Sequence, residues 1–444
     1  MNNISHIAIA ALIVVSSATS CGIYGRYKSQ TPQEVAEIQL PSYKEIFKDI
    51  RLQALVDTAL VRNYNLNAAH QRVRQADLKV TASKLAYLPR IFAGANPAVT
   101  LSGVGGQAVT SDNLSYTFAN ASWEIDIFGR LTNQKRISQA TREQMADFEQ
   151  AARSELIAAV ASLYYKLQVL DAQIAAADSA VATRYDSYVT MGYLKQTGRA
   201  DEAAVAQFEG SYLAAKCSAS NLRLMRIEDE NALKLLLCDE NADVSRSPLA
   251  VPGNSSAVDC SGLSAIDLRA VRVRPDVRAA EMQLASYFYN VNLARANCCP
   301  SIVIGGNVGW ASGSLIYNAV GGLLQPIFNA GENIIQVKVS KSQLEEAQLN
   351  YANALLKAGT EVNNAIAART TYEGQLADNE RRVKAMERAL DATQLKMKLG
   401  RGTYLEVLIS QNDLFDAKIS AIQNVGEILD SYVSLFLALG GGAN

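Results

Sequence analysis

Residues that perform acid–base or metal chemistry are scarce in this sequence. Its 444 residues include two histidines, His6 and His70. Histidine is the side chain best suited to proton transfer near neutral pH, so most histidine-based catalytic and metal-binding schemes are excluded. No G-x-S-x-G, Walker or H-E-x-x-H motif occurs. We therefore expect no catalytic residue, no metal ligand and no cofactor, and the chain is not predicted to be an enzyme.

Cysteine is the next reactive residue, and Cys21 has a specific context. A short apolar run at 7–15 is followed by the small residues 16–20 and then by Cys21. A brief apolar core with small residues before the cut is the pattern of an export signal. A cysteine in this position, followed by Gly22, resembles a bacterial lipobox. We expect residues 1–20 to be removed and Cys21 to carry covalent lipid.

The other five cysteines give no clear site. Their odd number does not indicate a disulfide framework, and their spacing matches no zinc pattern. Cys298 and Cys299 adjoin a predicted strand and are interpreted as small apolar fillers. A disulfide between Cys238 and Cys260 is left as an open alternative.

Two aspartates lie beside glycine or proline and are interpreted as structural. Asp126 precedes Gly129, which eases a bend between a strand and a helix. Asp276 follows Arg274 and Pro275. Proline suits the first turn of a helix, where its missing N–H costs nothing, and an aspartate there complements the helix dipole.

Charge and hydropathy restrict the partners. The formal net charge of -1 argues against a nucleic-acid partner, because phosphates require a basic surface. Outside the N-terminus, no apolar run reaches the roughly 20 residues of a spanning helix. A membrane crossing would therefore be made of strands.

Long helices must position the polar residues. No proline falls between 98 and 247 or after 326, and proline is expelled from helix interiors. Apolar residues from Leu156 to Val181 alternate steps of four and three, and a second stripe runs from Leu405 to Ile422. This is the spacing of a coiled-coil seam. The first helix, about 130–197, would be on the order of 100 Å long.

Two segments between the helices are predicted to be β-hairpins. They cover about 90–127 and 301–328, and they are interrupted by turns near Gly105 and Gly313. Each strand would have roughly ten residues, the length that crosses a bilayer when tilted. Four aromatic residues are candidates for rings at the membrane interface: Tyr116, Trp123, Trp310 and Tyr317.

The two halves of the chain repeat. The segment D-I-F ends at Phe128 and P-I-F at Phe328, 200 residues later, and Gly198-Arg199 corresponds to Gly400-Arg401. Each half reads as helix, hairpin, long helix, glycine turn and helix. The predicted boundaries are a signal peptide at 1–20, a lipid-anchored segment at 21–50, repeats at 51–237 and 263–439, a linker at 238–262 and a tail at 440–444.

At this point four motifs resemble those of a known family. Residues 122–130 are similar to its W-x-L-D-L-F-G-R segment, and 274–281 to its R-P-D-I-x-x-A-E segment. Residues 402–408 (G-T-Y-L-E-V-L) and the tail 438–442 (A-L-G-G-G) also match. The family is the TolC superfamily of outer-membrane efflux proteins, in its OprM- or NodT-like lipoprotein branch. The resemblance covers nearly all of the mature chain, in order.

This resemblance implies a mixed α+β fold. Each subunit would give four strands to a trimeric twelve-stranded β-barrel, continued by a long periplasmic α-helical coiled-coil barrel. A belt around the helices would come from the N-terminal segment, the 238–262 linker and the C-terminus. Four strands cannot close a barrel, and open edges are not tolerated in lipid, so oligomerisation is required.

The resemblance also implies a function. The homotrimer would be the passive outer-membrane channel of a tripartite efflux system in a Gram-negative bacterium. Its partners would be a periplasmic adaptor and an inner-membrane transporter of the resistance-nodulation-division type. The alternative is an exit duct for type I protein secretion, and the substrate is not in the sequence.

The glycine turns would form the periplasmic tip. The residues expected to form the gate or contact the adaptor are Gly198, Arg199, Asp201, Gly400, Arg401 and Glu406. In this hypothesis three copies of Glu406 line the closed end, and Arg401 tethers Glu406 or a neighbouring helix. The alternative is that these charges form only a solvated face.

Overall fold

The computed structural model describes residues 25–30, 42–99, 114–249, 268–311, 314–324 and 331–441. The signal segment with Cys21, the turns around Gly105 and Gly313, and Cys260 lie outside the described residues. The predicted lipid attachment at Cys21 and the open Cys238–Cys260 bridge therefore stay predictions.

The chain divides into two compact units, and each draws on both halves of the sequence. The first unit contains Met1–Pro32, His70–Asp147 and Asp276–Ala354. The second contains Gln33–Ala69, Phe148–Pro275 and Leu355–Asn444. The repeat seen in the sequence is thus distributed over both units.

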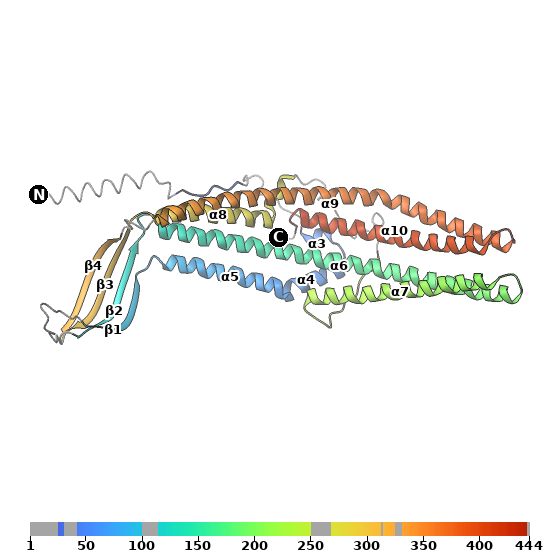
Figure 1. Cartoon of the computed structure of the whole chain (residues 1–444), viewed down its shortest axis with the longest axis horizontal. Coiled ribbons are helices and arrows are strands. Elements are labelled where there is room, and N and C mark those ends of the chain that lie inside the picture. Colours follow the sequence, from blue (N-terminus) through green and yellow to red (C-terminus); the bar gives the residue numbers. More distant parts are fainter. Residues whose placement is uncertain are drawn as a thin grey trace. The chain divides into compact units, whose positions relative to one another are not determined.

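The first unit contains an antiparallel sheet of four strands (Figure 1). The strands are β1 (Arg90–Val99), β2 (Leu114–Ile125), β3 (Ser301–Ala311) and β4 (Ser314–Leu324). Their order is β1-β2-β3-β4, so the two hairpins join through the β2–β3 pair. Both predicted hairpins are confirmed. Within the described residues, β1 and β4 are the edges of the sheet.

Two of the four aromatic candidates have described side chains on this sheet. The Tyr317 side chain is 81% exposed on β4. The Trp123 side chain is 41% exposed, and its Nε1–H donates a hydrogen bond to the Tyr87 carbonyl, 2.9 Å away. An apolar ring with a satisfied polar atom suits a membrane interface. The side chains of Tyr116 and Trp310 lie outside the described residues.

A polar network closes the junction between β2 and the long helix α6 (Arg130–Gln196). The Asp126 carboxylate accepts hydrogen bonds from the amides of Leu131 and Thr132, at 3.0 and 2.8 Å. Arg130 pairs with Glu124 through two hydrogen bonds. Gly129 has a φ of 72°, which favours glycine. The structural interpretation of Asp126 is therefore confirmed.

Helices continue the first unit beyond the sheet. α5 (Tyr64–Leu85) leads into β1, and α8 (Pro275–Ala296) leads into β3. α8 starts at Pro275 with Asp276 in its first turn, as predicted. The interpretation of both Cys298 and Cys299 as apolar fillers is wrong: Cys298 is exposed in the turn after α8 and Cys299 is intermediate. Both thiols lie back over the end of α8, where Cys298 Sγ donates to the Ala294 carbonyl at 3.5 Å and Cys299 Sγ to the Arg295 carbonyl at 3.8 Å.

Two helical hairpins form most of the second unit. α6 turns back into α7 (Glu202–Leu237), and α9 (Glu332–Lys398) turns back into α10 (Tyr404–Ala438). α6 and α9 each have 67 residues, so the repeat extends to helix length. α6 ends within one residue of the prediction. None of the helices among the described residues has both the length and the apolar character needed to span a membrane.

The predicted seam of α6 is confirmed, and that of α10 is corrected at its first residue, Leu405. Most of the α6 stripe is buried, including Val160 and Leu167, both with no exposed surface. On α10, Leu405 is 53% exposed, whereas Val407 and Ala417 are buried. The other residues of the stripe, among them Phe415 and Ile419, are half-buried in a single chain, and the Phe415 ring faces Arg184 of α6.

The N-terminal helices and the linker pack on one face of α6. Between α3 (Tyr43–Ile46) and α4 (Ile50–Arg62), Phe47 has no exposed surface, and its ring lies 5.3 Å from that of Phe436 on α10. The Tyr164 hydroxyl donates to Asp49 Oδ2 at 2.7 Å and accepts from the Ser247 amide at 3.0 Å. The N-terminal segment, the linker and the C-terminal helix thus meet around α6, as the resemblance implied for a belt.

Candidate functional site

Both helical hairpins turn through the same backbone motif at their tips. After α6, Gly198 N–H donates to Lys195 O at 3.0 Å, and Arg199 N–H donates to Leu194 O at 2.8 Å. After α9, the Gly400 and Arg401 amides make the equivalent bonds, at 3.0 and 2.9 Å. Both glycines have a φ of 70°. This is a Schellman ending, in which glycine tolerates the left-handed conformation.

The returning helices start from side-chain caps. The Asp201 carboxylate accepts a hydrogen bond from the Ala204 amide at 2.8 Å, and Thr403 Oγ1 accepts one from the Glu406 amide at 3.3 Å. These bonds satisfy amides that a helix start leaves without partners. Asp201 was predicted as a gate or adaptor contact, and its carboxylate here caps α7. Lys195 and Glu202 form an ion pair beside it.

A tyrosine that the sequence analysis did not single out connects the two tips. The Tyr404 hydroxyl donates a hydrogen bond of 2.7 Å to the carbonyl oxygen of Arg199. The bond joins the start of α10 to the turn after α6, 205 residues earlier. Tyr404 lies in the G-T-Y-L-E-V-L motif, but a motif match does not reveal such a long-range bond.

Further contacts connect α6 and α10 above the tips. Gln411 Nε2 donates to Ser187 Oγ at 2.9 Å. The Arg184 guanidinium lies 5.3 Å from the centre of the Phe415 ring and donates to the Ser211 carbonyl of α7 at 3.3 Å. Burial lowers the pKa of Arg184, and the negative charge of Asp416 opposes that effect. Arg184 therefore connects three helices near the tip.

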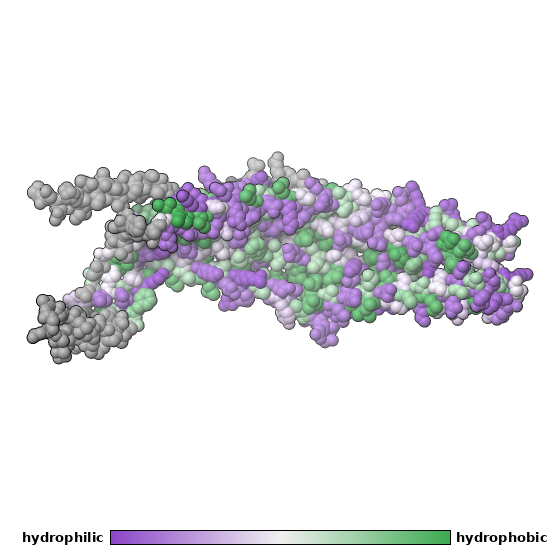
Figure 2. Space-filling view, viewed as in Figure 1, coloured by the Kyte–Doolittle hydropathy of each residue, from purple (hydrophilic) through white to green (hydrophobic). Residues whose placement is uncertain are grey.

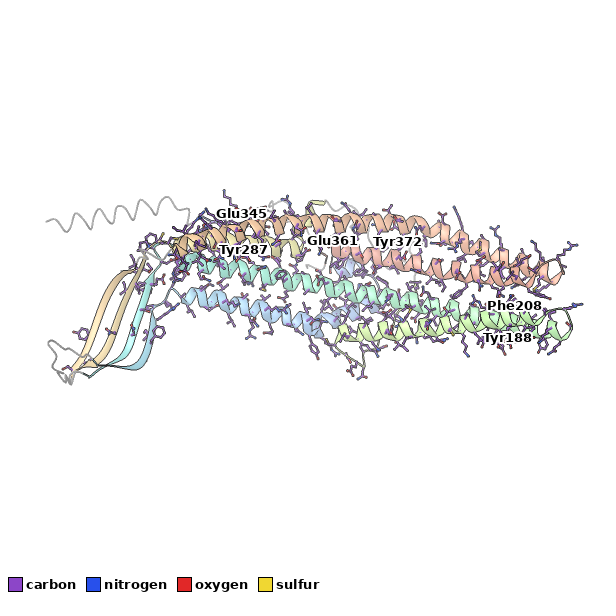
Figure 3. All side chains as sticks on the ribbon, viewed as in Figure 1. Tyr188, Phe208, Tyr287, Glu345, Glu361 and Tyr372 are labelled. Carbon is purple, nitrogen blue, oxygen red and sulfur yellow. The ribbon has the colours of Figure 1, made fainter. Side chains whose placement is uncertain are left out.

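An aromatic cluster lies on the tip half of the α6–α7 hairpin, where Figure 3 labels Tyr188 and Phe208. The rings of Tyr188 and Tyr212 stack with an interplanar angle of 2°, and Tyr185 packs against Tyr212 at 5.3 Å. Phe208 is buried. The ring contacts join α6 to α7 near the tip.

The remaining gate candidates are exposed charges. Arg199, Arg401 and Glu406 all have exposed side chains in the single chain. No ion pair joins Arg401 to Glu406 among the described residues, and the role of Arg401 as a tether to Glu406 or to a neighbouring helix stays a prediction. Arg401 precedes Thr403 and Glu406 follows it, and the cap bond of Thr403 fixes the start of α10. No cluster of three or more potential metal ligands occurs in the ranges that the structure describes.

A second pair of motifs meets at the other end of the second unit. Arg274 is 6% exposed, and its Nη1 donates to the Ala438 carbonyl at 2.9 Å. Its Nη2 donates to Glu361 Oε2 at 2.7 Å, on the stretch of α9 where Figure 3 labels Glu361. The R-P-D motif thus holds the A-L-G-G-G tail in place and is structural, as predicted.

Comparison with known proteins identifies this arrangement. The sequence model of the outer membrane efflux protein family matches residues 55–238 and 269–441. The chain belongs to this family. The family match spans both long helical hairpins and both tip turns.

Individual relatives cover nearly the whole chain. The cation efflux system protein CusC of Escherichia coli K12 is 27% identical over 417 residues, which are 91% of this chain and 89% of CusC. The toluene efflux pump outer membrane protein TtgC of Pseudomonas putida is 30% identical over 422 residues, 90% of this chain and 85% of TtgC.

Solved structures show the same fold. A crystal structure of CusC aligns with a TM-score of 0.82 at 24% identity and covers 94% of this chain and 98% of that chain. The outer-membrane channel OprN aligns with a TM-score of 0.83 at 22% identity and covers 94% and 99%. The chain is therefore a TolC-like efflux channel protein of the outer membrane, as the resemblance implied.

Proposed function

We propose that three copies of this chain form one passive tunnel, with the twelve strands closed into a barrel and the helical hairpins extended into the periplasm. The observation that carries the proposal is the pair of unpaired edge strands, β1 and β4, of the described sheet. Open edges are not tolerated in lipid, and identical copies close them with a repeated contact.

The tunnel would act without catalysis, as one component of a larger pump. Energy would come from an inner-membrane transporter of the resistance-nodulation-division type, and a periplasmic adaptor would join that transporter to the tips. The proposal is supported by relatives whose names describe them as parts of efflux systems and pumps. Lipid on Cys21 would anchor each subunit.

The tunnel itself is tested by planar-bilayer conductance. The purified protein should run as a trimer on native gels and insert as discrete conductance steps. A monomeric protein that gives no steps in any bilayer would refute the proposal.

The same assay tests the gate. Glu406→Gln should reduce cation selectivity, because a ring of carboxylates in a narrow pore attracts cations. Arg401→Ala should raise the leak conductance if Arg401 holds a neighbouring helix at the tip. Glu209→Gln, an exposed carboxylate further along α7, is the matched control. Parent selectivity and conductance in both tip variants would show that these charges are only a solvated face.

Lipid attachment has a direct test. Mass spectrometry of the purified protein should find a mature chain that begins at a lipid-modified Cys21. A chain that begins elsewhere, or an unmodified Cys21, would contradict the proposal.

A further inference from the structure

A groove in the second unit combines apolar walls with uncompensated negative charge. It has a volume of about 720 Å³ and is lined by α6, α7, α9 and α10. Binding sites for small organic molecules have this size and this mainly apolar character. The groove lies apart from the tips and from the Arg274 cluster.

The apolar walls are contributed by all four helices. Val169 and Leu170 lie on α6, Met225 on α7, Tyr372 on α9 (Figure 3) and Ile419 on α10. Met225 is 50% exposed, and its flexible, polarisable side chain suits contact with the apolar body of a ligand. Tyr372 offers an aromatic face, which attracts cations.

Small residues line part of the groove, including the place where α6 and α10 approach closely. A Cβ added to Gly426 of α10 would lie 2.5 Å from Cγ2 of Val169, so the two helices approach closely there. Ser162, Ala368 and Ser434 also line the groove with short side chains. Larger residues at these positions would fill the hollow.

The charges in the groove do not cancel. Lys166 Nζ is paired with Asp229 Oδ1 at 2.9 Å. Glu427 accepts a hydrogen bond only from the neutral amide of Gln423, at 3.3 Å among the described contacts, and Asp430 accepts one from the Ser162 hydroxyl at 2.6 Å. Two carboxylates therefore remain without a cationic partner among the described residues of the groove.

One wall of the groove adjoins the belt, because the ring of the lining residue Tyr165 lies 6.3 Å from that of Phe47, but the face of α6 that carries Lys166 is not covered by it. Tyr164 and Gln168 of α6 bond to Asp49 and to Ser247. Lys166, which lines the groove, lies two residues from each of them, about 200° around the helix. With the belt segments on the outside of the proposed tunnel, the exposed Lys166 side of the groove would face the interior.

We propose that this groove binds organic cations with an aromatic or apolar body as they pass through the tunnel. The inference rests on the proposed tunnel for its direction, but binding itself does not require conduction. The apolar walls would cover the body of the ligand, while Glu427 and Asp430 would balance its charge. A trimer would carry three such grooves in one ring.

The test is a fluorescence titration of the full-length protein in lipid nanodiscs with ethidium, a permanently charged aromatic cation. Empty nanodiscs give the background from lipid. Saturable binding above this background is expected. The double variant Glu427→Gln/Asp430→Asn should weaken binding by about 25-fold, from roughly fivefold for each partly exposed carboxylate.

Two further variants separate charge from shape. Ser434→Trp should abolish binding because it fills the groove. The control Asp413→Asn/Asp416→Asn removes two carboxylates of the same helix that do not line the groove, and it should bind like the parent protein. Anilinonaphthalene sulfonate, an aromatic anion, should bind the parent weakly and gain affinity in the Glu427→Gln/Asp430→Asn variant.

The outcomes distinguish the groove from the tunnel. No saturable ethidium binding, or equal loss of affinity in the control and the groove variants, would overturn the groove even if the same preparation conducts ions. Groove-specific binding by a monomeric preparation that gives no conductance would leave the groove standing and refute the tunnel.

Discussion

Replacing Arg274 by alanine should loosen the C-terminal end of α10. The guanidinium donates to the Ala438 carbonyl at 2.9 Å from a side chain that is 8% exposed. A buried hydrogen bond from a charged donor contributes about 1.5–3 kcal/mol. The second contact, to Glu361, involves a carboxylate that is 38% exposed and adds roughly 0.5–1 kcal/mol. Together these contacts predict a loss of about 2–4 kcal/mol in local stability.

Hydrogen exchange measures this loss directly. The Leu439, Gly440 and Gly441 amides donate to carbonyls at the end of α10, at 2.9–3.0 Å. Their exchange should accelerate by between about 30-fold and about 1000-fold in Arg274→Ala, since 1.4 kcal/mol is a factor of ten. The exchange rates in Arg274→Lys should lie between those of the parent and those of Arg274→Ala, because lysine keeps the charge but not the paired donors.

The control for this experiment is another arginine ion pair. Arg223 and Asp178 are 47% and 48% exposed, so Arg223→Ala should change exchange near the pair by no more than about fivefold and leave the C-terminal amides as they are. Unchanged exchange at these amides in Arg274→Ala would refute the role assigned to the R-P-D motif.

Two further predictions concern stability. Burial raises the pKa of Asp147 to about 6, although Arg278 lies 3.0 Å away and opposes the shift. The folded state then keeps a proton that the unfolded state releases as pH rises from about 4 to 6, so this residue costs stability above that range. Asp147→Asn should therefore stabilise the protein more at pH 7 than at pH 5. The gain in free energy of unfolding, measured by thermal melting, should differ by roughly 1 kcal/mol between the two pH values. An equal gain at both pH values would contradict the pKa shift. Gly440→Ala should lower the melting temperature by the equivalent of about 1–2 kcal/mol, because Gly440 has a φ of 80° and an added Cβ would lie 3.1 Å from Cγ of Arg274. Gly374→Ala, within α9 and with nothing within 4 Å of an added Cβ, should be neutral or stabilising, and an equal loss in both variants would refute the argument.

Local and periodic features were predictable from the sequence. The absence of proline and the apolar stripe placed α6 within one residue of its end, because helix interiors exclude proline and a buried face repeats every 3.5 residues. Gly198 and Gly400 marked both turns, since each needs a left-handed conformation. Gly129 and Asp126 likewise revealed a junction whose bonds span only a few residues.

Features that depend on distant packing could not be predicted. The Tyr404–Arg199 bond and the Arg274–Ala438 bond join residues 205 and 164 positions apart, and no local pattern requires them. Periodicity showed that α10 has an apolar face but not which part of that face a single chain covers. Leu405 was therefore predicted in the buried stripe, whereas it is exposed. The groove was missed for the same reason: it is made of small and ordinary residues that four helices bring together.

The four long helices differ in how much of their apolar surface a single chain covers. Contacts of α6 with α10, of α6 with α7 and of α9 with α10 place α7 and α9 at the two edges of the second unit. These edge helices expose large apolar side chains in a single chain, such as Leu224 (55%) and Leu235 (76%) on α7 and Leu356 (72%) and Leu395 (58%) on α9.

Figure 2 shows such apolar side chains mixed with hydrophilic ones along the helices on the face in view. The central helices α6 and α10 also expose apolar side chains towards the tips, such as Tyr193 and Leu405, but most of the α6 stripe is buried. In the proposed trimer, the α9 edge of one copy would cover the α7 edge of the next, while β4 would pair with the next β1. Contact between copies would thus serve each unit separately: it would close the sheet edges of the first and bury the apolar helical edges of the second.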